Sequence, residues 1–367
     1  MVNIAARNLW RDPWRLAISA GGLAFAVLLM LFLHATYVGQ IAQAGAFVDN
    51  AGADLWVTQE DTRDLFHGQS TLPGDLAGEL ALLPGVVAAS PLMGKSVHVA
   101  SVGDGADLFL VGYDPTTGMG GPWSMHSGRL VQGGNDIVVD RVFASVEGVD
   151  IGDDVTLGNA TFEVVGISRG ASTLFSNFAF IHVDAARALA PSSDVVNYYL
   201  LEVDGSPGSI VRAVEEMIPA SKTWTRDDFS EVNSRGSREA FLPVIATVMV
   251  LGFVVGAVVV GLTVYTATME RRAEYGVLKA MGAPQRKLGG MVLQYSIVST
   301  ALGTMMGVAL TFLADAIAEW LIPQMRADIT WAGIGSVVVA AVLITGVATL
   351  LPVRRIASLD PAEVFRV

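Results

Sequence analysis

Four long apolar segments are the strongest constraint on what this chain can fold into. They cover residues 16–38, 241–268, 289–314 and 331–351. Each supplies the roughly 20 apolar residues that a helix needs to cross the hydrocarbon core of a bilayer. The first segment is longer than the apolar part of a secretory signal, and no clear small-residue cleavage site follows it, so a retained membrane span is favoured over a cleaved signal.

Between the first and second spans lies a long polar region, residues 39–240. Short runs rich in β-forming residues, separated by Gly and Asp turns, alternate there with helix-like runs, one of them at 72–85. The pattern predicts a mixed α+β domain. Residues 229–240 contain one glycine and no proline, and are predicted to continue the second span as a helical stalk, with an ordinary linker as the alternative.

Charge is divided unevenly along the chain and predicts the orientation. Residues 1–15, 269–288 and 352–367 together carry a net charge of +6, whereas residues 38–240 carry −16. Cytoplasmic loops of membrane proteins are enriched in Lys and Arg. Four spans place all three basic segments on the same side, so the two termini are predicted to be cytoplasmic and the acidic domain extracytoplasmic. An acidic exterior also argues against binding to nucleic acid, whose phosphates need a basic surface.

The fold class predicted by these patterns is a membrane protein with four transmembrane α-helices and a large extracytoplasmic α+β domain inserted between helices 1 and 2. Its predicted order is a cytoplasmic amphipathic helix (1–15), a first span (16–38), the extracytoplasmic domain with its stalk (39–240), a second span (241–268), a cytoplasmic coupling helix (269–288), a third span (289–314), an external loop (315–330), a fourth span (331–351) and a cytoplasmic tail (352–367).

Motifs for catalysis are missing from the sequence. The chain has no cysteine, which excludes disulfides and thiol chemistry. Gly94-Lys95-Ser96 matches the end of a phosphate-binding loop, but Ala89 stands where that motif needs its first glycine. The five histidines are scattered, and no His/Asp/Glu cluster has the spacing of a metal site. We therefore predict no catalytic residue, no metal site and no intrinsic cofactor.

The first span carries unusual polar residues. Met30 and His34 are four residues apart and share a helical face, with Tyr37 close by. Polar residues inside a span are candidates for function, and Met and His are both ligands of haem iron. With Phe25 and Leu33 they form the predicted substrate-binding face. The alternative is that His34 lies at the outer membrane–water interface of this span, where amphipathic aromatic rings are enriched.

Two glycine pairs with the spacing G-x-x-x-G lie in the second and third spans. They are Gly252 with Gly256, and Gly303 with Gly307. Small residues at this spacing allow close approach of helices. The spacing leaves open whether each pair packs within one chain or forms a homodimer contact.

The stretch ERRAEYGVLKAMGAP, residues 270–284, is a charged, helix-forming segment held between two apolar spans. Because it is joined to both spans, a push on it would pass directly into the membrane. The stretch closely resembles the signature of the FtsX/MacB-type ABC transporter permeases. Residues 361–366 (PAEVFR) resemble the C-terminus of that family, and residues 6–11 its amphipathic pre-span helix. Residues 152–157 (GDDVTL) resemble part of its periplasmic core domain.

The resemblance covers the whole length and implies a fold, partners and a role. The family, also called type VII ABC, implies a homodimer of permeases on a dimer of separate ABC ATPase subunits, in the cytoplasmic (inner) membrane. No ATPase domain is fused here, and the compact size resembles the DevC/HrtB-like branch, which includes haem exporters. The residues that would couple to the ATPase are Glu270, Arg271, Arg272, Glu274, Tyr275, Gly276, Leu278, Lys279 and Gly282.

The expected function is that of a permease subunit. It would expel a hydrophobic or amphipathic substrate, with haem favoured, by mechanotransmission from the separate ATPase, which hydrolyses the ATP. The alternative to export is that the protein is a mechanotransmitter, which regulates an envelope hydrolase or a sensor. Export of a lipid, a lipoprotein or a peptide would use the same architecture.

Overall fold

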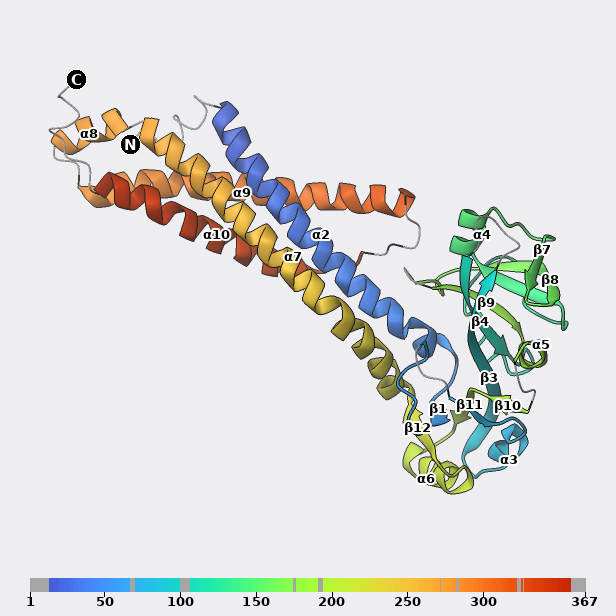
Figure 1. The fold of residues 1–367 in the computed structure, drawn as a ribbon. Helices are drawn as coiled ribbons and strands as arrows, with labels where there is room; N and C mark the ends of the chain where they lie inside the picture. The colour runs from blue at the N-terminus through green and yellow to red at the C-terminus, as the bar shows by residue number, and fades with distance from the viewer. Residues whose placement is uncertain are drawn as a thin grey trace. The chain divides into compact units, whose positions relative to one another are not determined.

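The computed structural model describes residues 13–66, 70–99, 106–173, 176–190, 194–270, 272–281, 284–321, 325 and 327–357. The chain divides into two compact units (Figure 1). The helical unit consists of Met1–Gly39, Phe241–Ile322 and Arg326–Val367, and the sheet unit of Gln40–Ala240 with Pro323–Met325.

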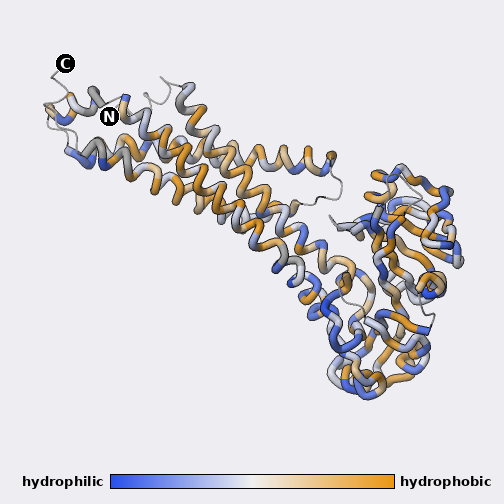
Figure 2. Tube along the Cα trace, in the orientation of Figure 1, coloured by the Kyte–Doolittle hydropathy of each residue, from blue (hydrophilic) through white to orange (hydrophobic). Residues whose placement is uncertain are grey.

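Four long helices run through the helical unit: α2 (Pro13–Asn50), α7 (Arg226–Glu270), α9 (Gln285–Leu321) and α10 (Trp331–Ala357). Each contains a stretch long and apolar enough to cross a membrane, and Figure 2 shows apolar residues along much of their length. The predicted fold class, four membrane helices with an inserted α+β domain, is confirmed. A short helix, α8 (Arg272–Ala280), stands between α7 and α9.

All four helices extend beyond the predicted spans, and α2 and α7 do so by the most residues. Helix α2 continues past residue 38 to Asn50, because residues 39–50 contain no proline and only two glycines, and it ends before Gly52, whose φ is +73°. Residues 229–240, for which the sequence predicts a helical stalk, lie inside α7. Helix α7 also contains Pro243, which removes one backbone donor from the helix.

The helices of the helical unit meet in an apolar core. Its centre is formed by Leu23, Val27 and Met30 of α2, which pack with side chains of α7, α9 and α10 such as Val260, Val292 and Ile344. The outward faces are apolar as well, as lipid contact requires: Leu262 of α7 is 62% exposed.

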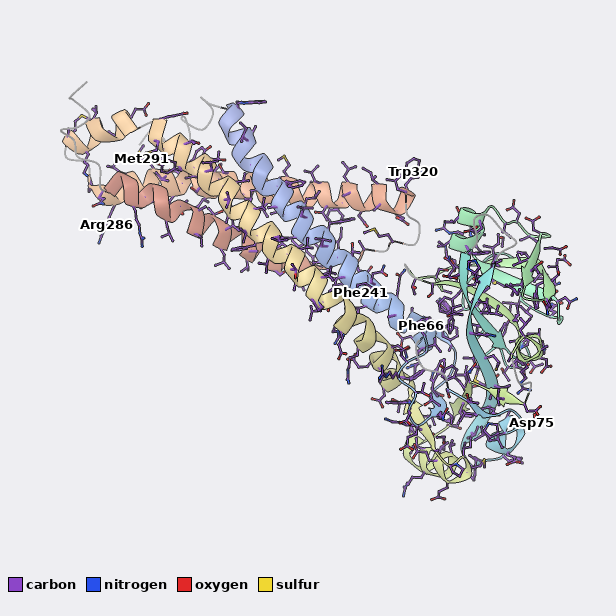
Figure 3. The ribbon with its side chains drawn as sticks, viewed as in Figure 1. Phe66, Asp75, Phe241, Arg286, Met291 and Trp320 are labelled. Atoms are coloured by element: carbon purple, nitrogen blue, oxygen red, sulfur yellow. The ribbon has the colours of Figure 1, made fainter. Side chains whose placement is uncertain are left out.

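Tryptophans stand at the ends of the membrane helices. Trp320 at the end of α9 is 80% exposed and Trp331 at the start of α10 is 88% exposed. Figure 3 shows Trp320 at one end of α9, with Arg286 and Met291 towards the other. Tryptophan is enriched at membrane–water interfaces and Arg in cytoplasmic loops, so the two ends of α9 differ as those of a membrane span do.

The sheet unit is built on a mixed sheet with the order β12-β1-β11-β3-β4-β9-β6-β8-β5, in which β7 pairs with β8. Its strands are β1 (Leu55–Gln59), β3 (Val86–Val99), β4 (Ala106–Tyr113), β5 (Met125–Gly128), β6 (Asp136–Asp140), β7 (Asp154–Leu157), β8 (Ala160–Ser168), β9 (Asn177–His182), β11 (Tyr198–Val203) and β12 (Ser221–Thr225). A separate small pair joins β2 (Leu72–Pro73) to β10 (Val195–Val196). Its helices are α3 (Ala77–Ala81), α4 (Arg141–Glu147), α5 (Val183–Ala188) and α6 (Pro207–Met217).

Strand β3 joins the two halves of this sheet. Its first half pairs with β11 and its second half with β4, over a length of 14 residues. Most neighbours are antiparallel, whereas β4–β9 and β6–β8 are parallel. The helix predicted at 72–85 is shorter than expected, because residues 72–73 pair with β10 instead and only Ala77–Ala81 forms a helix.

One face of the sheet is covered by aromatic side chains, to which the two long helices contribute. Phe47 near the end of α2 lies 5.5 Å from Phe178, measured between ring centroids. Phe229 near the start of α7 lies 5.1 Å from Trp56. All four rings are buried. Aromatic pairs at these distances add to the stabilisation from apolar burial, so the ends of α2 and α7 are packed firmly into the sheet unit.

Candidate functional site

Helix α8 has an inward and an outward face. Gly276 is buried and Leu278 packs against the apolar core of the helical unit. On the other side, Glu274 is exposed, Val277 is 41% exposed and Met281 is 71% exposed. The Met281 amide donates to the Val277 carbonyl at 3.0 Å, which continues the helical turn and keeps these two side chains on one face.

The predicted coupling residues are distributed around this helix. Glu270 is the last residue of α7 and is exposed, and Lys279 is half-buried. Arg272 and Tyr275 lie in α8 by their backbone. Arg271 and Gly282 lie outside the described residues.

Val277 and Met281 are the outward residues that the sequence reading missed. The pattern that marks them is an apolar pair four residues apart in an otherwise polar segment. Leu278, an apolar residue in the same segment, packs against the core of the helical unit instead. Spacing alone does not separate the inward from the outward residues, because Val277 and Leu278 are neighbours in α8 and Met281 follows its last residue, Ala280.

The predicted substrate-binding face of α2 is covered by neighbouring helices. Met30 is 2% exposed and belongs to the core of the helical unit. A Cβ atom placed on Gly252 of α7 would lie 3.4 Å from Met30 Cγ, and one on Gly333 of α10 would lie 2.7 Å from His34 Cδ2. Met30 and His34 are therefore packed against α7 and α10 respectively.

The other three residues of that predicted face differ in exposure. Leu33 and Tyr37 are half-buried, whereas Phe25 is 56% exposed and does not lie with the buried Met30. The structure thus brings Met30 and His34 together on one side of α2 and leaves Phe25 on another.

The glycine pair of α9 packs directly on the backbone of α2. A Cβ atom on Gly303 would lie 2.8 Å from Ala20 O, and one on Gly307 would lie 2.7 Å from Ala24 O. Real Cβ atoms are not found this close to backbone oxygens. Within this chain, the pair allows α9 to pack directly on the backbone of α2.

The glycine pair of α7 also faces α2. A Cβ atom on Gly256 would lie 2.8 Å from Ala26 Cβ, and Gly252 adjoins Met30. Both G-x-x-x-G pairs therefore pack within the chain, which was one of the two possibilities that their spacing left open.

Within the sheet unit, Asn233 fixes the first part of α7 to the loop that follows β1. Asn233 is 3% exposed. Its Oδ1 accepts a hydrogen bond from the Leu65 amide at 2.8 Å, and its Nδ2 donates to the Phe229 carbonyl at 2.7 Å. A buried residue that satisfies two backbone groups is a strong positional constraint. Sequence reasoning missed it, because Asn233 stands in a charge-mixed segment with no motif of its own.

Among the described residues, no three His, Asp or Glu side chains come together in a way that could hold a metal ion.

Two family models match this chain. The MacB-like periplasmic core domain matches residues 16–220, more than half of the chain, and the FtsX-like permease C-terminal model matches residues 246–361. The chain belongs to the FtsX/MacB family of ABC transporter permeases. The permease is thus a multi-pass membrane protein, and permeases of ABC transporters work with ATPase subunits.

Individual relatives agree with this assignment. An uncharacterized ABC transporter permease of Mycobacterium tuberculosis is 29% identical over 373 residues, covering 100% of this chain and 99% of the relative. A probable export ATP-binding/permease protein of Pseudomonas fluorescens is 22% identical and covers 98% of this chain but 61% of the relative. A putative hemin transport system permease protein, HrtB, of Staphylococcus epidermidis is 23% identical over 245 residues, covering 65% of this chain and 66% of the relative.

Proposed function

We propose that this permease is the membrane subunit of an ATP-driven exporter, in which α8 docks on a separate ATPase subunit. The observation that carries the proposal is the outward face of α8, with Val277 and Met281 exposed beside Glu274. An exposed apolar pair on a polar helix favours contact with another protein. The inward Leu278 anchors the same helix to the membrane core, so a force on the outward face reaches the spans.

The position of α8 in the chain supports this role. It stands between the end of α7 at Glu270 and the start of α9 at Gln285. A displacement of α8 therefore acts on two membrane helices at once. In the proposed cycle, two copies of the permease stand on an ATPase dimer in the inner membrane, with both termini cytoplasmic. ATP binding brings the two α8 helices together, and the spans expel the substrate outward.

Replacing Met281 with alanine is expected to weaken capture of the ATPase at least about fivefold, because an anchor residue at an interface contributes more than about 1 kcal/mol to binding. The measurement is co-purification of the tagged permease, co-expressed with the ABC ATPases of its own genome. Met305→Ala is the matched control, since Met305 is 70% exposed on the membrane helix α9. Equal capture by the Met281→Ala and wild-type proteins would contradict docking through this face.

For the substrate, we propose an amphipathic molecule that enters from the membrane, and haem as the first to test. Two observations support haem: the name of the relative from Staphylococcus epidermidis, and the Met30–His34 pair on α2. Because Met30 is 2% exposed and His34 packs on Gly333, haem ligation would require α2 to move away from α7 and α10. The movement of α2 and the binding of haem iron by Met30 and His34 would then occur in the same step.

Haem added to the permease–ATPase complex is expected to shift its Soret band in a saturable way, and His34→Ala to abolish the shift, because the imidazole would be an axial ligand. The measurement is an absorbance titration in lipid nanodiscs. His98→Ala serves as the control, since the His98 side chain is 63% exposed in the sheet unit. A shift that persists in His34→Ala, or no shift in wild type, would remove haem and leave lipids or peptides as substrates.

A further inference from the structure

Helix α7 is weakened by two features at the same place. Pro243 has no backbone N–H, so the carbonyl of Glu239, four residues earlier, receives no helical hydrogen bond from it. One turn later, the Thr247 hydroxyl donates to the Pro243 carbonyl at 2.8 Å. Proline is a usual cause of a sharp helix kink, and a threonine hydroxyl bonded to the carbonyl four residues earlier often bends a helix. The sequence of α7 therefore favours a bend near Pro243.

Helix α2 is weakened in a similar way. It contains Gly39, and glycine is among the least favourable residues in the interior of a helix. Three residues before Gly39, the Thr36 hydroxyl donates to the Phe32 carbonyl at 2.9 Å, which is the same kind of bond that Thr247 makes in α7. Each of the two helices thus combines a residue that disfavours a helix with a threonine that bends it.

The two weak points lie at the same level of the α2–α7 pair. Within the helical unit, Met30 of α2 packs at Gly252 of α7, and the two glycine contacts of α7 show that the helices run in opposite directions. Gly39 follows Met30 by nine residues, and Pro243 precedes Gly252 by nine residues. A bend of α7 at Pro243 is therefore matched by a weak point at the same level of α2.

Packing holds α7 on both sides of this level but not within it. Asn233 and Ser234 are buried on one side, and Gly252 is buried on the other. Between them, at residues 235–251, every residue whose burial the structure describes is exposed or half-buried, and Val244 beside the proline is 62% exposed. A segment with few buried apolar contacts opens or bends at low cost, so α7 bends here more easily than within either core.

The division of the chain into two compact units falls at the same place. It cuts α2 between Gly39 and Gln40, and α7 between Ala240 and Phe241. Phe241 is labelled on α7 in Figure 3, and Pro243 follows it by two residues. Both helices are continuous across the cut. Each therefore passes from one unit to the other at its weakest point.

We propose that Gly39 and Pro243 form a paired hinge, at which α2 and α7 bend together and reorient the sheet unit as one body. Phe47 of α2 and Phe229 of α7 are buried in the sheet unit, so these ends of the helices move with it. The other ends are held in the apolar core of the helical unit. Bending needs neither a substrate nor an ATPase, so the hinge and the exporter proposal can each fail without the other.

The test measures distances between pairs of spin labels by double electron–electron resonance, on the full chain in lipid nanodiscs. The chain has no cysteine, so labels attach only to cysteines that are introduced. Two labelled positions lie in the sheet unit, Leu82 at 85% and Val146 at 55% exposure, and one lies in the helical unit, at the exposed Glu319. An excess of unlabelled permease ensures that each measured distance lies within one chain.

A hinge is expected to broaden only the distances that cross it. A kink of about 20° moves a label roughly 30 Å away by about 10 Å, so one or both of the pairs Leu82–Glu319 and Val146–Glu319 are expected to have a distribution at least about twice as broad as that of Leu82–Val146. Pro243→Ala allows the missing helical hydrogen bond to form. It is expected to narrow the broad distributions and to leave Leu82–Val146 unchanged.

Three variants separate the hinge from a general effect of substitution. Val244→Ala is the matched control, because it changes an exposed neighbour and keeps the proline. Thr247→Val removes the hydroxyl that bonds to Pro243 and is expected to narrow the same distributions by a smaller amount. Pro243→Ala is expected to unfold at the temperature of wild type or above it, because alanine favours a helix.

Three results would each overturn the hinge. The first is a wild type in which both distributions that cross the hinge are as narrow as that of Leu82–Val146. The second is a set of broad distributions that neither Pro243→Ala nor Thr247→Val narrows. The third is equal narrowing by Val244→Ala and Pro243→Ala, which would assign the effect to the exposed surface of α7 and not to the proline.

Discussion

Gly307→Ala is expected to destabilise the packing of α2 on α9 by about 1–3 kcal/mol, the usual cost of inserting a methyl group into a filled contact. The new methyl would lie 2.7 Å from both Ala24 O and Val27 Cβ. The oxygen belongs to backbone, which cannot rotate away as a long side chain can. The helices must therefore separate, and the measurement is thermal unfolding of the purified permease in nanodiscs.

Gly290→Ala on the same helix is the matched control, because a Cβ atom there meets nothing within 4 Å. Alanine in place of glycine favours a helix in itself, so this control is expected to be neutral or slightly stabilising. If Gly307→Ala unfolded like the control but changed the oligomeric state, the glycine pair would serve a contact between two copies. Gly303→Ala, whose methyl would lie 2.8 Å from Ala20 O, is expected to behave like Gly307→Ala.

Asp136→Asn is expected to lower the stability of the sheet unit at neutral pH by roughly 2 kcal/mol. The Arg129 guanidinium, followed by the amides of Gly133 and Gln132, lowers the pKa of Asp136 from 3.8 to about 2. A carboxylate whose pKa is lowered by folding stabilises the folded state above its unfolded pKa. That contribution is lost as the pH falls from about 4 to about 2.

The measurement is thermal unfolding of wild type and Asp136→Asn between neutral pH and about pH 2. The difference between them is expected to be largest at neutral pH and to vanish at the acid end. Asp153→Asn is the control, because Asp153 is exposed and its carboxylate accepts a single backbone hydrogen bond from the described residues, donated by the Asp150 amide. A difference between wild type and Asp136→Asn that did not change with pH would show that shape, and not charge, explains the loss.

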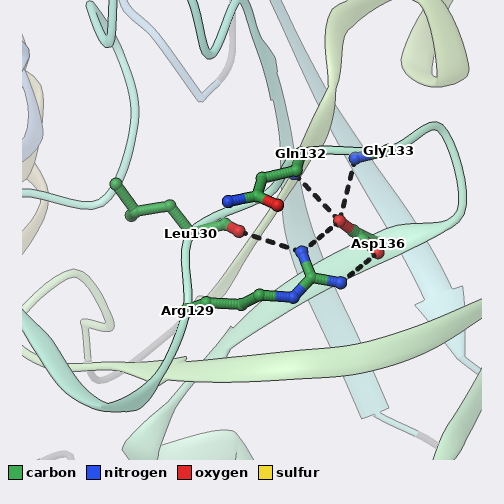
Figure 4. Close-up of polar contacts among 5 residues, drawn as sticks. All are labelled: Arg129, Leu130, Gln132, Gly133 and Asp136. Atoms are coloured by element: carbon green, nitrogen blue, oxygen red, sulfur yellow. Dashed lines mark hydrogen bonds and ion pairs between the residues drawn. The ribbon is translucent and has the colours of Figure 1, made fainter.

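By holding the amides of Gln132 and Gly133 (Figure 4), Asp136 also shapes the wall that residues 130–132 give to a cavity of the sheet unit. Acid conditions that protonate Asp136 are therefore expected to loosen that wall as well as to destabilise the unit.

Patterns that are local in the sequence predicted the architecture well. Length and hydropathy were enough to predict four membrane helices. A helix needs about 20 apolar residues in a row to cross the bilayer, and few other backbone structures can cross it. Gly and Asp turns between β-forming runs, together with helix-like runs, were enough to predict a mixed domain after the first span. The family signature in residues 270–284 was enough for the place of α8.

Element boundaries and faces were predicted less well. The first helix runs to Asn50, and the predicted helix at 72–85 is reduced to Ala77–Ala81, because residues 72–73 find a strand partner more than 100 positions later. A helical pattern describes only neighbours along the chain, so pairing with a distant strand is invisible to it.

What the sequence determined by itself was the number of spans, the class of the inserted domain and the family, since each depends on residues close together in the chain. Only the tertiary structure decided that Gly303 and Gly307 meet the backbone of α2, and that Met30 is covered while Met281 is exposed. The physical reason is that packing and solvation depend on which surfaces meet in space. A residue's spacing fixes the side of the helix on which it lies, but not what stands opposite.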